Sequence, residues 1–219
     1  MLSTGRLSRA GLALLFTSVI VNPASVASAA ACDMDVTDNT FRRGLDINDM
    51  SDEVRANIRT VEQYHFTADV AALRKGITTE LPGDIEYTLR YIPNHYAALM
   101  SYAKWELEHP GAAASQPRSI DCYFQRAVGF QPSDTRLHAL YGVVLHRARR
   151  YSEARKEYQA AEEMGLESAE LFYNRGLLEL DTGNVDVARA YAEKAYALGY
   201  PLPGLRTRLK RAGAAAQQP

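Results

Sequence analysis

The feature that most constrains this chain is a repeat of fixed length in its second half. Two copies of one pattern lie over residues 135–168 and 169–202, and small residues recur in them at a separation of 34. The recurring pairs are Gly142 and Gly176, Ala154 and Ala188, Ala161 and Ala195, and Gly165 and Gly199. The pattern predicts two helix-turn-helix units, each closed by a glycine after its second helix.

Gly142 and Gly176 fall inside predicted helices, where a glycine costs about 1 kcal/mol relative to alanine. We interpret both as sites of close approach, because two helices can pack tightly only where the side chains between them are small. Helical propensity is lost at these positions and helix–helix packing is gained.

A 34-residue helix-turn-helix unit with small residues at these sites resembles the tetratricopeptide repeat. Tyr158 takes the large aromatic site of that family, whereas Ala192 stands at this site in the last unit, beside Tyr191. A further 34 residues toward the N-terminus, Phe124 and Ala127 match the aromatic and small sites. The resemblance implies an all-α, right-handed solenoid of about three such units.

The chain divides into seven expected regions. We expect Asn94 to cap the first helix of the earliest unit and "HPGAAASQP" to lengthen its turn. The regions are a signal peptide (1–29), an acidic and loosely ordered arm (30–49), lead-in helices with a degenerate half-repeat (50–92), a unit with a long turn (93–134), two regular units (135–168 and 169–202), and a capping helix with a flexible tail (203–219).

The segments "EQYHFTADVAALRKG", "DIEYTLRYIPNHYAALMSYA" and "AYALGYPLPGLR" resemble a group of exported bacterial tetratricopeptide proteins. The resemblance covers roughly residues 60–210. It supports the boundaries above and implies no activity.

The N-terminus has the layout of a secretory signal peptide. Arg6 and Arg9 precede a short apolar run, and Ala27-Ser28-Ala29 supplies a cleavage site with small residues. We therefore expect a periplasmic protein cleaved near Ala29, with no transmembrane segment in the mature chain. The alternative is a lipoprotein anchored through Cys32, because small residues also precede this cysteine.

Charge argues against nucleic acid as the main partner. The formal net charge is -1, and it becomes more negative when the two arginines of the signal peptide are removed. The charges are local instead: residues 33–53 hold seven acids, whereas the tail from Gly204 holds Arg206, Arg208, Lys210 and Arg211 and no acid.

The resemblance implies that the first helices line a groove that holds a peptide or helix of another envelope protein. The expected floor is apolar with few charges. The residues expected to contact a partner are Met100, Lys104, Leu107, Arg136, Val143, His146, Tyr173, Asn174 and Leu177. Ala97, Ala139, Glu170 and Leu180 follow the same spacing, and core packing is the competing interpretation for each position.

This reading makes the protein an interaction adaptor or scaffold. The alternative function is a lipid-anchored structural accessory of a secretion or polysaccharide-export complex.

The two cysteines, Cys32 and Cys122, are expected to pair in an oxidising compartment. The spacing suggests that Cys122 points away from its partner helix, and the arm supplies its mate. A bond between them would close a loop of about 90 residues, worth about 4 kcal/mol in the chain-entropy model. Lipidation of Cys32 would exclude this disulfide.

No motif for nucleophilic catalysis, phosphate binding or a cofactor stands in the sequence, so we predict a protein that is not an enzyme. The strongest enzymatic pattern is a pair of Glu-x-x-His motifs, Glu62/His65 and Glu106/His109. This spacing occurs in di-iron helical bundles. His109 precedes Pro110 and therefore stands at a helix end, which favours surface positions for these side chains.

Overall fold

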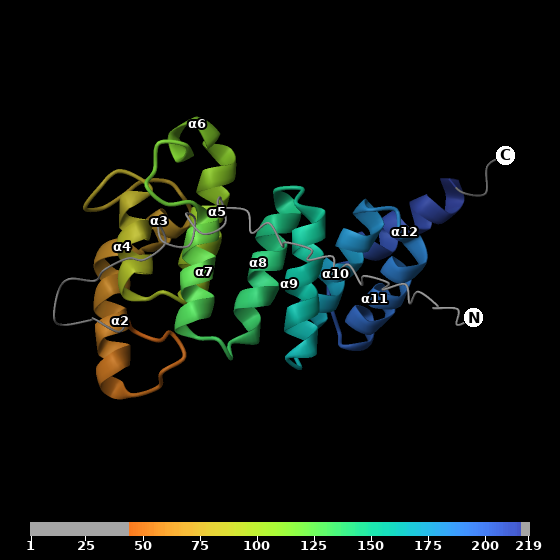
Figure 1. Ribbon diagram of the computed structural model, residues 1–219, viewed down its shortest axis with the longest axis horizontal. Helices are drawn as coiled ribbons and strands as arrows, with labels where there is room; N and C mark the ends of the chain where they lie inside the picture. The colour runs from red at the N-terminus through yellow and green to blue at the C-terminus, as the bar shows by residue number, and fades with distance from the viewer. Residues whose placement is uncertain (1–43, 216–219) are drawn as a thin grey trace, which may run out of the picture.

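The computed structural model describes residues 44–215, which form eleven helices and no strand. The helices stand side by side in a row, with the N-terminal helices at one end and the last helix at the other (Figure 1). They are α2 (Asp52–His65), α3 (Ala68–Ala71), α4 (Gly83–Tyr91), α5 (Tyr96–Glu108), α6 (Pro110–Ala113), α7 (Ile120–Phe130), α8 (Thr135–Arg147), α9 (Tyr151–Glu163), α10 (Ala169–Asp181), α11 (Val185–Ala197) and α12 (Gly204–Ala215). None of the described helices is both long enough and apolar enough to cross a bilayer.

The predicted helical pairs are present: α8 packs on α9, and α10 packs on α11. Gly165 and Gly199 both have positive φ angles, +89° and +83°, and each follows the end of a second helix. Their amides donate to the carbonyls of Glu162 and Tyr196, which closes the last turn of α9 and of α11. This confirms the glycine caps that the repeat predicts.

Gly142 is a site of close approach, as the sequence indicates. A Cβ atom at this position would lie 2.5 Å from two ring carbons of Tyr158 on α9. The small sites Ala154 and Ala161 on the same helix are fully buried. The absent side chain at Gly142 therefore sets the spacing between α8 and α9.

Gly176 has a different neighbour from its counterpart Gly142. A Cβ atom at Gly176 would lie 2.6 Å from Leu205 Cδ2, on the capping helix α12. Ala192 stands at the aromatic site of this unit, so no ring covers Gly176 from α11. Leu205 of α12 packs over Gly176 in the way that Tyr158 packs over Gly142. Alanine in place of an aromatic residue at position 192 thus leaves the space over Gly176 that Leu205 of the capping helix α12 fills.

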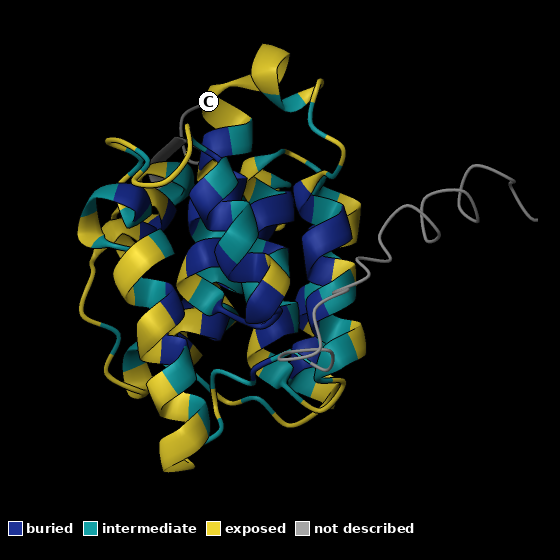
Figure 2. Ribbon diagram, turned by 90° about the vertical axis from the view of Figure 1, so that its left-hand side faces the viewer, coloured by how far each residue is buried: buried dark blue, intermediate teal, exposed yellow. Residues whose placement is uncertain are grey.

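Three buried clusters hold the row of helices together. One is centred on α4, α5 and α7 and includes the fully buried Tyr102 and Phe124. A second runs from α8 to α12 and contains Tyr158 and Leu205. A third, smaller cluster joins α2 to the C-terminal end of α4. Seen from the end of the row, buried residues fill the interior and exposed residues cover the outer faces of the helices (Figure 2).

Before α7 the structure departs from the sequence-based expectation. The N-cap of α5 is His95, whose ring accepts from the Ala98 amide, and not Asn94. Asn94 is instead fully buried, where it accepts from the Ile47 amide and donates to Asp46.

The long turn after α5 contains the short helix α6, and the lead-in helix expected near residue 70 is reduced to the four residues of α3. The described end of the acidic arm is also packed rather than loose. Leu45 is buried and its amide bonds to the Tyr91 carbonyl, while Asp46 accepts from Gln131 of the α7–α8 connection. The rest of the arm lies outside the described residues.

A buried carboxylate organises the loop between α3 and α4. Asp84 is fully buried and accepts hydrogen bonds from the backbone amides of Ile77 and Thr78 and from the Thr78 hydroxyl. His65 Nδ1 lies 2.9 Å from Asp84 Oδ1. Burial by itself would raise the pKa of Asp84, but these hydrogen bonds outweigh it and lower the pKa to about 2.

Candidate functional site

Three adjoining hollows follow the first helices of the repeats. They have volumes of about 390, 550 and 430 Å³. The first two share Tyr96 and Arg136, and the last two share Val143 and Asn174. We call this continuous depression the α8–α10 groove. Each of the three hollows has a volume in the range that ligand sites occupy.

The central hollow lies between α8 and α10 and is lined mainly by apolar side chains. They are Tyr96, Ala139, Leu140, Val143, Leu166 and Leu171. Glu167 and Glu170 also line it, and both are exposed and form no ion pair among the described residues. Arg136 lines it as well, so the hollow combines an apolar interior with two carboxylates and one guanidinium.

Tyr158 also lines the central hollow, although it belongs to the second helix α9. Its residue is 1% exposed, and its hydroxyl has no hydrogen-bond partner. Burial raises the pKa of this hydroxyl and outweighs the opposite effect of Arg147 and Arg175. The ring reaches this position because Gly142 leaves space for it.

One end of the groove is a network of polar side chains. Tyr96 Oη donates to Asp134 Oδ2 at 2.5 Å, and Asn48 Nδ2 donates to Tyr96 Oη at 2.8 Å. Burial, followed by the hydrogen bond to Asp134, raises the pKa of Tyr96 to about 12. Asp46 lines the same hollow, so this end of the groove carries two carboxylates close to the described N-terminus.

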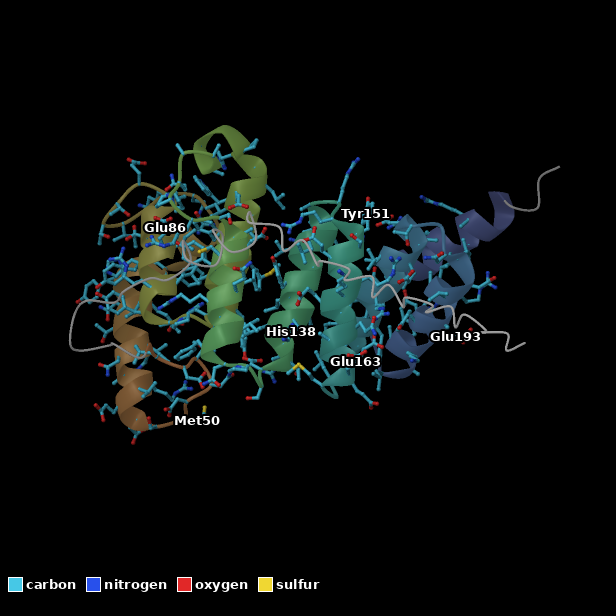
Figure 3. The ribbon with its side chains drawn as sticks, in the orientation of Figure 1. Met50, Glu86, His138, Tyr151, Glu163 and Glu193 are labelled. Atoms are coloured by element: carbon cyan, nitrogen blue, oxygen red, sulfur yellow. The ribbon has the colours of Figure 1, made fainter. Side chains whose placement is uncertain are left out.

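The opposite end is rich in cationic side chains. His146 Nε2 lies 2.9 Å from Asp181 Oδ2, and Arg208 of α12 forms an ion pair with the same carboxylate. Arg147 and Arg149 line this end without an ion-pair partner among the residues described. Tyr151, which also lines it, stands at one end of α9, with Glu163 at the other (Figure 3).

The structure brings together most of the groove residues predicted for the two regular units. Those that line the groove are Arg136, Ala139, Val143, His146, Glu170, Asn174 and Leu177. Tyr173 does not line it: its residue is 8% exposed and its ring stacks on Tyr200 at 4.0 Å. Tyr173 is a core residue because the cap packs against α10. Leu180 likewise belongs to the packing around the second core.

The residues predicted for the earliest unit lie outside the groove. Met100 packs on the N-terminal core, Lys104 pairs with Glu108 at 3.8 Å, and Leu107 is exposed. Ala97 does not line any of the three hollows either. The long turn and α6 interrupt the regular unit here, so the 34-residue register does not carry the groove onto α5 beyond Tyr96.

Sequence reasoning missed the contributions of Tyr158, Tyr96 and the loop of residues 166–168. The 34-residue pattern gives no signal for them, because Tyr158 occupies the aromatic core site of a second helix and the others lie at or before the start of a first helix.

A separate hollow of about 640 Å³ lies between α11 and α12. Arg189, Arg206 and Lys210 line it together with Glu193, and Arg206 lies over the Tyr196 ring. This hollow is larger than each hollow of the groove. It is formed by the capping helix α12 and by α11, the second helix of the last unit. It shares no lining residue with the α8–α10 groove.

Cys122 lies on α7 and is buried. Its predicted mate, Cys32, lies outside the described residues, as do the signal peptide and the lipidation site. The disulfide therefore stays a prediction.

The two Glu-x-x-His motifs do not converge on one site. Glu62 contacts His95, whereas His65 contacts Asp84. Glu106 accepts from the Ile120 amide, and its pKa is raised by burial. Within residues 44–215, no three His, Cys, Asp or Glu side chains gather as a metal site would require. These side chains are structural where they are described.

Comparison with known families agrees with this geometry. Residues 118–165 and 142–203 match the model of the tetratricopeptide repeat. The matched segment spans α7 to α11 and contains both regular units. This part of the chain therefore belongs to the tetratricopeptide repeat family. No curated protein matches the chain in sequence.

Proposed function

We propose that this protein is an interaction adaptor that holds a segment of another protein in the α8–α10 groove. The observation that carries the proposal is the continuity of the three hollows along the first helices of the repeats. Repeats of this family typically act as interaction modules, and an apolar groove with a polar margin suits a peptide or a helix.

The charges of the groove favour one orientation of the occupant. At the central hollow the two carboxylates of Glu167 and Glu170 outnumber the guanidinium of Arg136 and attract basic residues. Arg147 and Arg149 at the far end attract acidic ones. A segment with both kinds of charge would therefore bind in one direction. Exposed charges of this kind contribute mainly to orientation and association rate, so the apolar hollow supplies most of the affinity.

We further propose that the adaptor works in the periplasm on a protein of the cell envelope. The observation that supports this location is the signal-peptide layout of residues 1–29. Fractionation of cells that produce the full chain tests this part. Recovery of a shortened protein in the periplasmic fraction supports it, and recovery of the full-length chain in the cytoplasm contradicts it.

Site-specific photo-crosslinking tests the groove. A benzophenone amino acid replaces Ala139 in the groove or, as a matched control in the same repeat, the exposed Gln159 on α9. We expect adducts with a discrete partner from position 139 and none of the same mass from position 159. A second substitution, Leu177→Glu, should remove the adduct while the helical circular-dichroism spectrum stays unchanged. Equal adducts from both positions would contradict a groove-bound partner.

A further inference from the structure

The hollow between α11 and α12 has a counterpart one repeat earlier, where α9 packs on α10. Each residue that lines the hollow lies 34 positions after a residue of α9 or α10. The equivalent pairs include Ala192 and Tyr158, Leu209 and Arg175, and Gly213 and Glu179. In addition, α12 contacts α10 and α11 as α10 contacts α8 and α9. The helix α12 therefore takes the place of a first helix beside α11.

At the earlier junction these positions are covered by α11, the second helix of the following unit. Tyr191 Oη of α11 donates to Glu162 at 3.3 Å, and the Arg175 guanidinium lies 5.0 Å from the centre of the Tyr191 ring. Lys194 of α11 lies over the ring of Phe172. Among the described residues α12 is the last helix, at the end of the row (Figure 1). The hollow is therefore the place where one more helix would pack.

The hollow lacks a carboxylate that the earlier junction has. There Arg155 of α9 donates two hydrogen bonds to Glu179 of α10. The counterpart of Arg155 is Arg189, but the counterpart of Glu179 is Gly213. A Cβ atom at Gly213 would meet no atom within 4 Å, so this part of the hollow is open. Arg189 thus stands at an arginine site of the repeat without the acid that pairs with it.

The charges that line the hollow are mostly positive. Arg189, Arg206 and Lys210 line it with one carboxylate, that of Glu193. Arg206 and Lys210 form no ion pair among the described residues. Arg189 lies 3.9 Å from Asp186, whose side chain is 98% exposed, and such a pair contributes little. An occupant with negative charge would therefore complement the hollow.

We propose that the hollow between α11 and α12 is a docking site for an acidic amphipathic helix of a partner protein, which packs on α12 as α11 packs on α10. The buried Ala192 and Leu209 form an apolar floor, and the exposed cations form the rim, as in protein interfaces. An acid of the partner helix takes the role beside Arg189 that Glu179 has beside Arg155. The site is separate from the α8–α10 groove, so one chain can hold two partners at once.

The test is selection on the folded protein from a displayed library of helical peptides with one randomised face. Gly213→Glu supplies the counterpart of Glu179, and Arg189→Gln removes the cation. Lys156→Gln is the control, because Lys156 is exposed on α9, lines neither the hollow nor the groove, and its loss changes the net charge equally. Leu177→Glu is the groove variant, and circular dichroism checks the fold of all four.

We expect the selected peptides to combine apolar residues with a net negative charge. Their affinity should fall about 5- to 10-fold on Gly213→Glu and about 3-fold on Arg189→Gln, and less than about 2-fold on Lys156→Gln and Leu177→Glu. Peptides that bind native protein and Gly213→Glu equally, or discriminating peptides that are neutral or basic, would overturn the proposal. Sedimentation tests the other occupant: a native dimer that Gly213→Glu converts to a monomer would place a second copy in the hollow and overturn it as well.

Discussion

Helices α8–α11 and helices α2–α5 are elements of one kind, yet different contacts hold them together. In α8–α11 the helices meet through small residues at fixed spacing, such as Gly142 against Tyr158. In the region of α2–α5 the connections are irregular and polar side chains enter the interior. Six polar or charged residues are buried in the described chain, and five of them lie between Asp84 and Ser101.

The two regions differ in which groups accept the hydrogen bonds of their backbone amides. A regular helical hairpin pairs its own amides and needs only a short turn. In the loop before α4, the amides of the exposed residues Ile77, Thr78 and Thr79 instead donate to the buried carboxylate of Asp84. The repeats bury one carboxylate, Glu179, and it pairs with the guanidinium of Arg155 through two hydrogen bonds. Irregular structure therefore depends on single side chains more than repeats do.

The largest expected effect comes from removing the buried acceptor of the loop. Asp84→Ala removes the acceptor of three loop amides and of the Thr78 hydroxyl, and should lower the free energy of unfolding by about 4 kcal/mol. Glu179→Ala leaves Arg155, which is about one-third exposed and can turn to solvent, so we expect a loss of about 2 kcal/mol. Urea denaturation measures both, and Asp69→Ala is the surface control with a loss below about 0.5 kcal/mol. A larger loss for Glu179→Ala than for Asp84→Ala would reverse the comparison.

Acid should act on the same carboxylate. The pKa of Asp84 is lowered to about 2, whereas an unfolded aspartate titrates near 3.9. The stability that its ionised form contributes is fully present above the unfolded value and is lost as the pH falls through the folded value. Between about pH 4 and pH 2 this loss should reach roughly 2 kcal/mol.

Carboxyl-carbon NMR of the folded protein measures the folded pKa directly, and urea midpoints at constant ionic strength measure the stability. A titration of Asp84 near pH 4 in the folded protein would contradict this role for the loop amides.

The smallest expected effect concerns Gly142 and separates the role of this glycine in helix packing from its low helix propensity. Gly142→Ala places a methyl group against the Tyr158 ring and should cost about 1–2 kcal/mol after the gain in helix propensity. Gly129 on α7 has no atom within 4 Å of such a methyl group, so Gly129→Ala should stabilise the protein by up to about 1 kcal/mol. Thermal melts of the two variants should therefore shift in opposite directions. Shifts of the same sign would mean that Gly142 is not a packing site.

How far the sequence predicted the structure depended on the regularity of each region. The period of 34 located the two regular units, their glycine caps and the residues of α8 and α10 that face the groove. Lys104 and Leu107 were misplaced because the same register was extended across a turn that contains α6. Tyr173 was misplaced because the position of the cap cannot be derived from the repeat itself.

For a related reason, the sequence did not predict the buried polar residues in the region of α2–α5. Asn94 followed the rule for N-caps, but His95 takes that role, and Asn94 binds the segment near Asp46. Such a choice depends on contacts between residues almost 50 positions apart. Local propensity carries no information about these contacts, whereas it does describe helices that pair with their neighbours.

The exchange of Tyr158 for Ala192 at equivalent sites has a consequence for the growth of such arrays by duplication. A copy of residues 135–168 inserted before Ala169 would leave α10, α11 and α12 in contact with one another, because these helices would stay consecutive in the chain. A copy with tyrosine at position 192 would compete with Leu205 for the space over Gly176, so α12 could no longer dock. The alanine therefore marks the last unit, and the number of repeats can change upstream while the terminus stays the same.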